Sequence, residues 1–126
     1  MANQAIITPN LELGPILKGA SAALESNHVL KASPGRIFKL TVAHTYTTSG
    51  VWVLLFDTAA VPADGAVTPD WAFPLAAATS QAQGGNIDWN SYPREMVHGI
   101  CVALSSATSP FTLTSQPNAF FSWQVQ

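Results

Sequence analysis

The residues that could carry chemistry in this 126-residue chain are few, and they match no established catalytic or metal-binding pattern. The three histidines, His28, His44 and His98, form no HxH, HExxH or standard zinc spacing. His98 and Cys101 are three residues apart, so on a regular strand their side chains would lie on opposite faces and could not chelate one metal. We therefore expect no metal and no cofactor; a metal shared between subunits across a symmetry axis is the alternative left open.

Nucleophilic catalysis has no visible support either. A nucleophile needs an activating base and a third, orienting group. The single cysteine, Cys101, lies between two apolar residues of an expected strand, and the pair Ser105-Ser106 lacks the GxSxG context. The seven acidic residues are explained by turns and strand ends. The sequence therefore predicts a protein that is not an enzyme.

Aromatic residues could instead bind a ligand. Four tryptophans offer surfaces on which sugars could stack: Trp52, Trp71, Trp89 and Trp123. The candidate ligand-contacting set is Trp89 with the polar residues beside it, Asn86, Asp88 and Asn90. A structural interpretation competes with this one, because Trp71, Trp89 and Trp123 each fall on the apolar side of their strand. That placement favours their filling a core.

Period-2 alternation of apolar and polar residues is the main structural signal in the chain. In residues 36–45 the even positions Phe38, Leu40 and Val42 are large and apolar. In residues 119–125 the odd positions Phe121 and Trp123 are the apolar ones. Short β segments separated by Gly, Pro, Ser and Asn predict an all-β fold of about seven or eight antiparallel strands, a β-sandwich or jelly roll.

Residues 51–56 (VWVLLF) are apolar on both faces of their expected strand. Such a strand is either central and covered on both sides, or turns its outer face to a partner. The interface candidates from this segment are Val51, Trp52, Leu54 and Phe56. Trp52 is the strongest of them, because large aromatic residues often anchor protein interfaces.

The first 26 residues differ from the rest of the chain. Pro9 and Pro15 interrupt them, no long strand fits, and only residues 19–26 could form a helical turn or two. We expect residues 1–26 to be an irregular N-terminal arm and residues 27–126 to be the β-sandwich domain. The arm either drapes over its own domain or reaches a neighbouring subunit.

Composition points towards an assembly. Charged residues make up 10% of the chain, whereas an ordinary soluble domain carries roughly 25%. The net charge is −2 and the five cations are scattered along the sequence, which argues against nucleic-acid binding. No apolar run is long enough to span a bilayer, and the N-terminus does not resemble a signal peptide. A single cysteine fits folding in a reducing cytoplasm.

Three segments, KASPGRIFKLTVAHT, VWVLLFDTAAVPADGAVTP and GICVALSSAT, resemble a group of small phage-encoded virion accessory proteins. The shared features are Gly35, Phe56-Asp57, the loop from Pro62 to Gly65, and the strand from Gly99-Ile100 to Ser105-Ser106. The resemblance covers about residues 31–126. It implies a capsid, neck or tail component made in many copies, and it carries no catalytic residue.

The sequence therefore predicts a structural protein of a bacteriophage virion, made in the host cytoplasm, that decorates, cements or extends the capsid, neck or tail. Its expected partners are other copies of itself, as a trimer or larger homo-oligomer, and other virion proteins. Nucleic acid and membranes are not expected partners. The alternative function is a β-sandwich module that binds carbohydrate or a host receptor, with a host-surface glycan as ligand.

Overall fold

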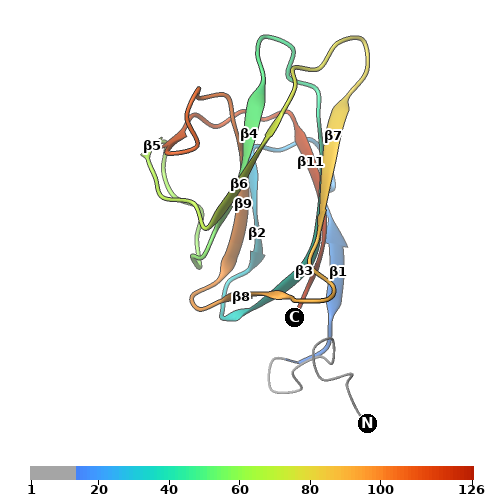
Figure 1. Ribbon diagram of the computed structural model, residues 1–126, viewed down its shortest axis with the longest axis vertical. Helices are drawn as coiled ribbons and strands as arrows, with labels where there is room; N and C mark the ends of the chain where they lie inside the picture. Colours follow the sequence, from blue (N-terminus) through green and yellow to red (C-terminus); the bar gives the residue numbers. More distant parts are fainter. Residues whose placement is uncertain (1–13) are drawn as a thin grey trace.

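The computed structural model describes residues 14–126, and these residues form strands and loops without a helix (Figure 1). No helix long and apolar enough to cross a membrane is therefore found in this part of the chain. The strands are β1 (Leu17–Ala20), β2 (Asn27–Lys31), β3 (Gly35–His44), β4 (Val51–Phe56), β5 (Gly65–Ala66), β6 (Trp71–Leu75), β7 (Gln83–Asp88), β8 (Arg94–Met96), β9 (Ile100–Ser105), β10 (Thr112–Leu113) and β11 (Ala119–Val125).

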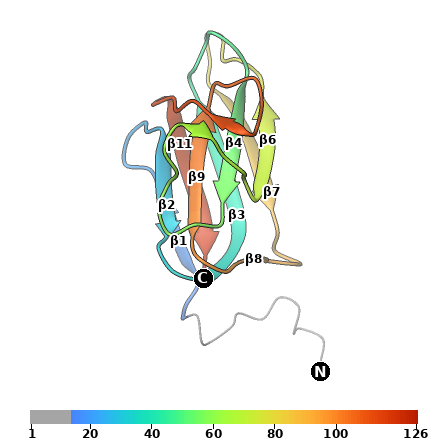
Figure 2. The same cartoon turned by 90° about the vertical axis from the view of Figure 1, so that its left-hand side faces the viewer.

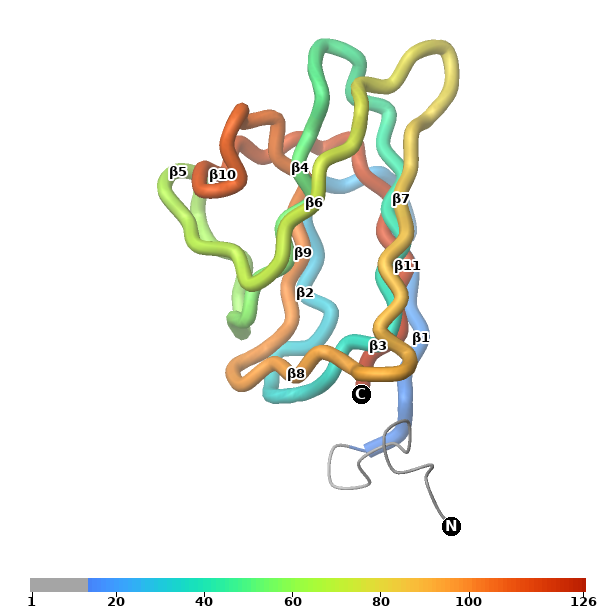
Figure 3. The backbone as a smooth tube through the Cα atoms, viewed as in Figure 1, coloured from blue at the N-terminus to red at the C-terminus, as the bar shows by residue number. Residues whose placement is uncertain are grey.

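Two antiparallel sheets face each other and form a sandwich (Figures 1 and 3). Sheet A has the order β1-β11-β3-β7, with β8 pairing the start of β3, and sheet B has the order β2-β9-β4-β6. The chain changes sheet at most connections between these strands; β4 and β6 follow each other within sheet B, and β7 and β8 within sheet A. This is the topology of a jelly roll, so the predicted fold class is confirmed.

The inner faces of both sheets form the main core. Ile100, Val102 and Leu104 of β9 meet Phe121 and Trp123 of β11 there, and alternation had predicted this placement for Phe121 and Trp123. The prediction that Phe38 shares the buried face of β3 with Leu40 and Val42 was wrong. Between β3 and β11 the register shifts at a β-bulge, with Val125 opposite Ile37 and Gln124 opposite Lys39. The bulge puts Ile37, rather than Phe38, into the main core cluster.

Sheet B is covered on its outer face as well. The connections 57–70 and 106–118 pair through β5 and β10 and lie over β4 and β9; we call them the flap (Figure 2). A second core cluster forms beneath it from Leu54, Phe56, Cys101, Ala103 and Leu113. Strand β4 is therefore a central strand with both faces buried, the first of the two alternatives drawn from its sequence.

This burial corrects three of the four interface candidates. Val51, Leu54 and Phe56 are each 2% exposed or less, because the chain's own cores enclose them. They leave no surface for a neighbouring subunit in this fold. Trp52 alone is half-buried, packed against the second core cluster.

The predicted boundary at residue 26 was also wrong. Residues 17–20 form β1, which pairs with β11 at the edge of sheet A, and no helical turn forms over residues 19–26. Glu25 and Ala119 form an isolated bridge that holds the next connection in place. The sandwich therefore includes these residues, while the rest of the expected arm, residues 1–13, lies outside the described residues.

Two local features follow from this topology. Residues 47–50 cross between the two layers, because β3 and β4 belong to opposite sheets. The strand that begins at Trp71 contains Pro74, which cannot donate a ladder hydrogen bond and therefore suits the edge of a sheet. This strand is β6, which lies at the edge of sheet B.

Candidate functional site

An open hollow of about 460 Å³ lies where β7 ends and the chain turns towards β8. It is lined by five consecutive residues, Asp88, Trp89, Asn90, Ser91 and Tyr92, and we call it the 88–92 hollow. Three of the four predicted ligand-contacting residues, Asp88, Trp89 and Asn90, are among them. The hollow is therefore the candidate functional site of the described chain.

The base of the 88–92 hollow is fixed by packing and hydrogen bonds. The backbone N–H of Trp89 donates to the carbonyl of Phe38 at 2.7 Å, and the Trp89 ring packs against the main core. Its ring also meets the Trp71 ring edge-on, with centroids 5.9 Å apart at 83°. Trp89 thus fills the edge of the sandwich, as the structural interpretation of its parity predicted.

Arg94 supports this aromatic pair from β8. Its guanidinium carbon lies 4.8 Å from the centroid of the Trp71 ring. The Nε–H of Arg94 donates to Oδ2 of Asp70 at 2.6 Å, and Nη2 donates to the Asp70 carbonyl at 2.8 Å. The Arg94 guanidinium therefore uses both its charge and two of its N–H donors on Asp70.

The rim of the 88–92 hollow carries polar atoms that face solvent. Oδ1 of Asp88 accepts the backbone N–H of Asn90 at 2.9 Å, which closes a turn and leaves Oδ2 without a hydrogen bond to the described chain. The side chains of Asn90, Ser91 and Tyr92 make no hydrogen bond to other described residues and are exposed. They can exchange hydrogen bonds with a bound molecule.

The fourth predicted ligand contact, Asn86, lies elsewhere. It shares the outer face of sheet A with Thr41, whose hydroxyl donates to Oδ1 of Asn86 at 2.8 Å. Sequence reasoning also missed Tyr92, whose side chain is 73% exposed. Tyr92 follows the last alternating residue and belongs to no strand, so no periodic signal marks it.

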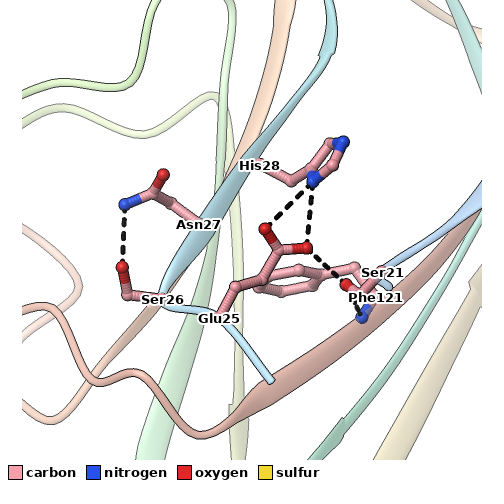
Figure 4. Close-up of polar contacts among 6 residues, drawn as sticks. All are labelled: Ser21, Glu25, Ser26, Asn27, His28 and Phe121. Carbon is pink, nitrogen blue, oxygen red and sulfur yellow. Dashed lines mark hydrogen bonds and ion pairs between the residues drawn. The ribbon is translucent and has the colours of Figure 1, made fainter. Parts of the chain in front are cut away.

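A second polar cluster joins the two sheets beside β1 and β2 (Figure 4). Oγ of Ser21 accepts the backbone N–H of Phe121 at 2.9 Å and donates to Oε2 of Glu25 at 2.5 Å. Nδ1 of His28 lies 2.9 Å from the same carboxylate oxygen. The His28 ring packs on Trp123 with centroids 4.5 Å apart.

This cluster resembles a catalytic triad only in composition. A triad places histidine between the nucleophile and the carboxylate, so that histidine accepts the nucleophile's proton. Here Glu25 lies between Ser21 and His28: both side chains contact its carboxylate, and no hydrogen bond joins His28 to the Ser21 hydroxyl (Figure 4). The contacts tie sheet A to the first strand of sheet B, which is a structural role.

Asp57 and Cys101 are likewise used by the fold. Burial by itself would raise the pKa of Asp57, but hydrogen bonds from the backbone N–H groups of Val97, His98 and Gly99 outweigh it and lower the pKa. Burial raises the pKa of the Cys101 thiol, which donates to the Thr58 carbonyl at 3.2 Å. A protonated, buried thiol is a poor nucleophile.

Fold and site together define a class: a jelly-roll β-sandwich whose candidate site is an open, aromatic and polar hollow. Among residues 14–126 no group of three or more His, Cys, Asp or Glu side chains could hold a metal ion. Comparisons with models of protein families, with curated proteins and with solved structures found no match for the chain.

Proposed function

We propose that this protein is a structural component of a bacteriophage particle that self-associates through the side of the sandwich formed by β1 and β2. Jelly rolls serve as capsid proteins and as lectins, so the fold alone does not decide between functions. The likeness of residues 31–126 to small virion accessory proteins supports the first of these. The low content of charged residues supports burial of surface between subunits.

One observation supports placing the contact between subunits on the side formed by β1 and β2. Among the described residues, nine large hydrophobic side chains are exposed, and four of them, Ile16, Leu17, Leu24 and Val29, come from the short stretch 16–29. This stretch contains β1 and β2, which are the edge strands of sheets A and B on the same side of the sandwich (Figure 2). Exposed apolar residues gathered on edge strands are typical of contact surfaces.

The contact we propose is made by side chains rather than by addition of strands. Strand β2 carries Lys31 and a register shift between Val29 and Lys31, both of which discourage edge-to-edge pairing. Strand β1 is only four residues long. Packing of Leu17 and Val29 against a neighbour would bury apolar area without extending either sheet.

The test is association with particles. The full chain, produced in a culture that carries its gene together with the rest of the phage genome, is sought by mass spectrometry in gradient-purified particles. We expect many copies per particle. We also expect the variants Leu17→Glu and Val29→Glu to be strongly depleted from the particles, because a buried unpaired charge opposes the contact. The matched control is Val97→Glu, which changes an exposed residue between β8 and β9.

Presence of the wild-type chain in the particles at many copies, with depletion of only the two edge variants, supports the proposal. Absence of the chain from purified particles would overturn the virion role. Equal incorporation of all variants would overturn the choice of the β1–β2 side.

A further inference from the structure

We infer that the 88–92 hollow is a binding site for a neutral saccharide. This goes beyond the proposed structural role, because a particle component could assemble without binding any sugar. The inference rests on one juxtaposition: a solvent-exposed aromatic ring stands beside unpaired hydrogen-bond donors and acceptors over a rigid base.

Tyr92 supplies the aromatic surface. Its side chain is 73% exposed, so the ring contributes little to the chain's own cores. An exposed ring offers an apolar face to the C–H groups of a pyranose, while its hydroxyl can donate and accept a hydrogen bond. Trp71, 38% exposed, supports the base of the hollow through its edge-on contact with Trp89.

The polar rim matches the hydroxyl groups of a sugar. Each hydroxyl can donate one hydrogen bond and accept others, so a site needs both kinds of partner. Oδ2 of Asp88 accepts, the Asn90 amide donates and accepts, and the Ser91 hydroxyl does both. None of these atoms is hydrogen-bonded to another described residue. The hollow therefore presents both kinds of partner within five consecutive residues.

The charges favour a neutral ligand over an acidic one. The lining of the 88–92 hollow holds one carboxylate, that of Asp88, and no cation. Arg94, the nearest arginine in sequence, is held by Asp70 and covers the Trp71 ring. Lys39 is the cross-strand partner of Asp88 in the pairing of β3 with β7, so a cation lies on the strand next to this carboxylate.

The base of the site is ordered before any ligand arrives. The Trp89 backbone is bound to β3, the turn at Asn90 is closed by Asp88, and Trp89 is wedged against Trp71. Pre-ordering lowers the entropy cost of binding. An open hollow still buries little of its ligand, so we expect weak binding by one copy and firm attachment only when many copies act together.

The experiment has two stages and uses the full chain. First, the protein is biotinylated, displayed in several copies on streptavidin and applied to an array of neutral and acidic oligosaccharides. Then the neutral sugar that binds best is titrated into the isotopically labelled protein and followed by NMR. We expect a neutral oligosaccharide to bind and the backbone signals of residues 88–92 to shift.

Two variants distinguish the contribution of the Tyr92 ring from that of its hydroxyl. Tyr92→Ala should weaken binding at least tenfold, because the aromatic surface is lost. Tyr92→Phe keeps the aromatic ring and should retain most of the sugar affinity. The matched control Phe111→Ala removes another exposed aromatic ring, on the flap, and should bind as the wild type does. Thermal unfolding verifies that each variant is folded.

The inference is overturned if no neutral sugar binds, if acidic sugars alone bind, or if binding survives Tyr92→Ala in a folded protein. It is also overturned if Tyr92→Ala lowers the mass of the protein in solution without affecting sugar binding, since the ring would then be a protein contact. The mass in solution tests self-association separately, so failure of one proposal does not decide the other.

Discussion

Gly19 of β1 lies directly against the ring of Trp123 on β11, and a Cβ atom at residue 19 would come within 2.5 Å of Cε2 of that ring. The two residues are also partners in the pairing of β1 with β11. His28 of β2 covers the same ring. The missing side chain at residue 19 thus lets Trp123 close the side of the sandwich between β1 and β2.

Gly19→Ala should destabilise the fold. The added methyl group forces the large, buried Trp123 ring to move, and overpacking of this kind costs about 1–3 kcal/mol. Urea unfolding followed by tryptophan fluorescence measures the change. In a Trp123→Phe background the same substitution should cost clearly less, because the ring atoms that it meets are absent. An equal cost in both backgrounds would contradict the account of this contact.

Asp57→Asn should make stability less dependent on pH. The pKa of Asp57 is lowered in the folded protein, so its carboxylate stabilises the fold above the unfolded pKa of about 3.9. That contribution is lost as the pH falls through the folded-state pKa. At pH 7 we expect the variant to lose about 1–3 kcal/mol, since three backbone N–H groups lose a charged acceptor.

Urea unfolding from pH 7 down to pH 3 tests the prediction for Asp57. The difference between wild type and Asp57→Asn should narrow as the solution becomes acidic. Glu95→Gln makes the same chemical change at a carboxylate that is 72% exposed and should alter stability little. A difference for Asp57→Asn that stays constant over this range would argue against the carboxylate's role in holding residues 97–99.

Ser21→Ala should destabilise the fold. Ser21 is buried, and its hydroxyl satisfies the backbone N–H of Phe121 and donates to Glu25. Leaving a buried donor unsatisfied costs about 1–3 kcal/mol. Thermal or urea unfolding gives the value. Ser33→Ala, in an exposed turn, is the control, and its free energy of unfolding should stay within about 0.5 kcal/mol of the wild type. Similar losses for the two variants would contradict a stabilising role for the Ser21 hydrogen bonds.

Trp52→Ala should unfold the flap region rather than disturb association. Trp52 packs on the cluster that includes Leu54 and Leu113, beneath the flap. Because its side chain is half-buried, we expect a loss of about 3 kcal/mol, the low end for aromatic-to-alanine changes in cores. Phe111→Ala, at an exposed flap residue, is the control. If a folded Trp52→Ala protein instead loses its oligomeric state, Trp52 is an interface residue after all.

Local alternation predicted the strands and their buried faces well. Phe121 and Trp123 point into the main core, and β4 is buried on both sides, because the spacing of apolar residues along a strand follows which of its faces are buried. Pro74 lies in the edge strand β6, as expected for a residue that cannot donate a ladder hydrogen bond.

Which strands pair with each other could not be predicted in the same way. Nothing in residues 47–50 says that they connect opposite sheets, since pairing depends on contacts between residues far apart in the chain. Strand β1, with the sequence LKGA, lacks β-branched residues and is held by β11 rather than by its own propensity. The flap was also missed, so Leu54 and Phe56 were assigned to an interface that the chain itself provides.

The candidate site was predicted in part. Asp88, Trp89 and Asn90 line the 88–92 hollow, whereas Asn86 lies on the outer face of sheet A. Alternation at the end of β7 identified the first three but says nothing about the turn that follows. The exposed ring of Tyr92 is set by that turn, whose shape depends on the Asp88 carboxylate and on the anchoring of Trp89 to β3.

The mass of the purified full chain in solution, measured by light scattering over a range of concentrations, tests the proposed self-association most directly. The account predicts a trimer or larger species, at least three times the monomer mass of 13.3 kDa, that dissociates in Leu17→Glu and Val29→Glu but persists in Val97→Glu. A wild-type protein that stays monomeric at the highest concentration reached would contradict it.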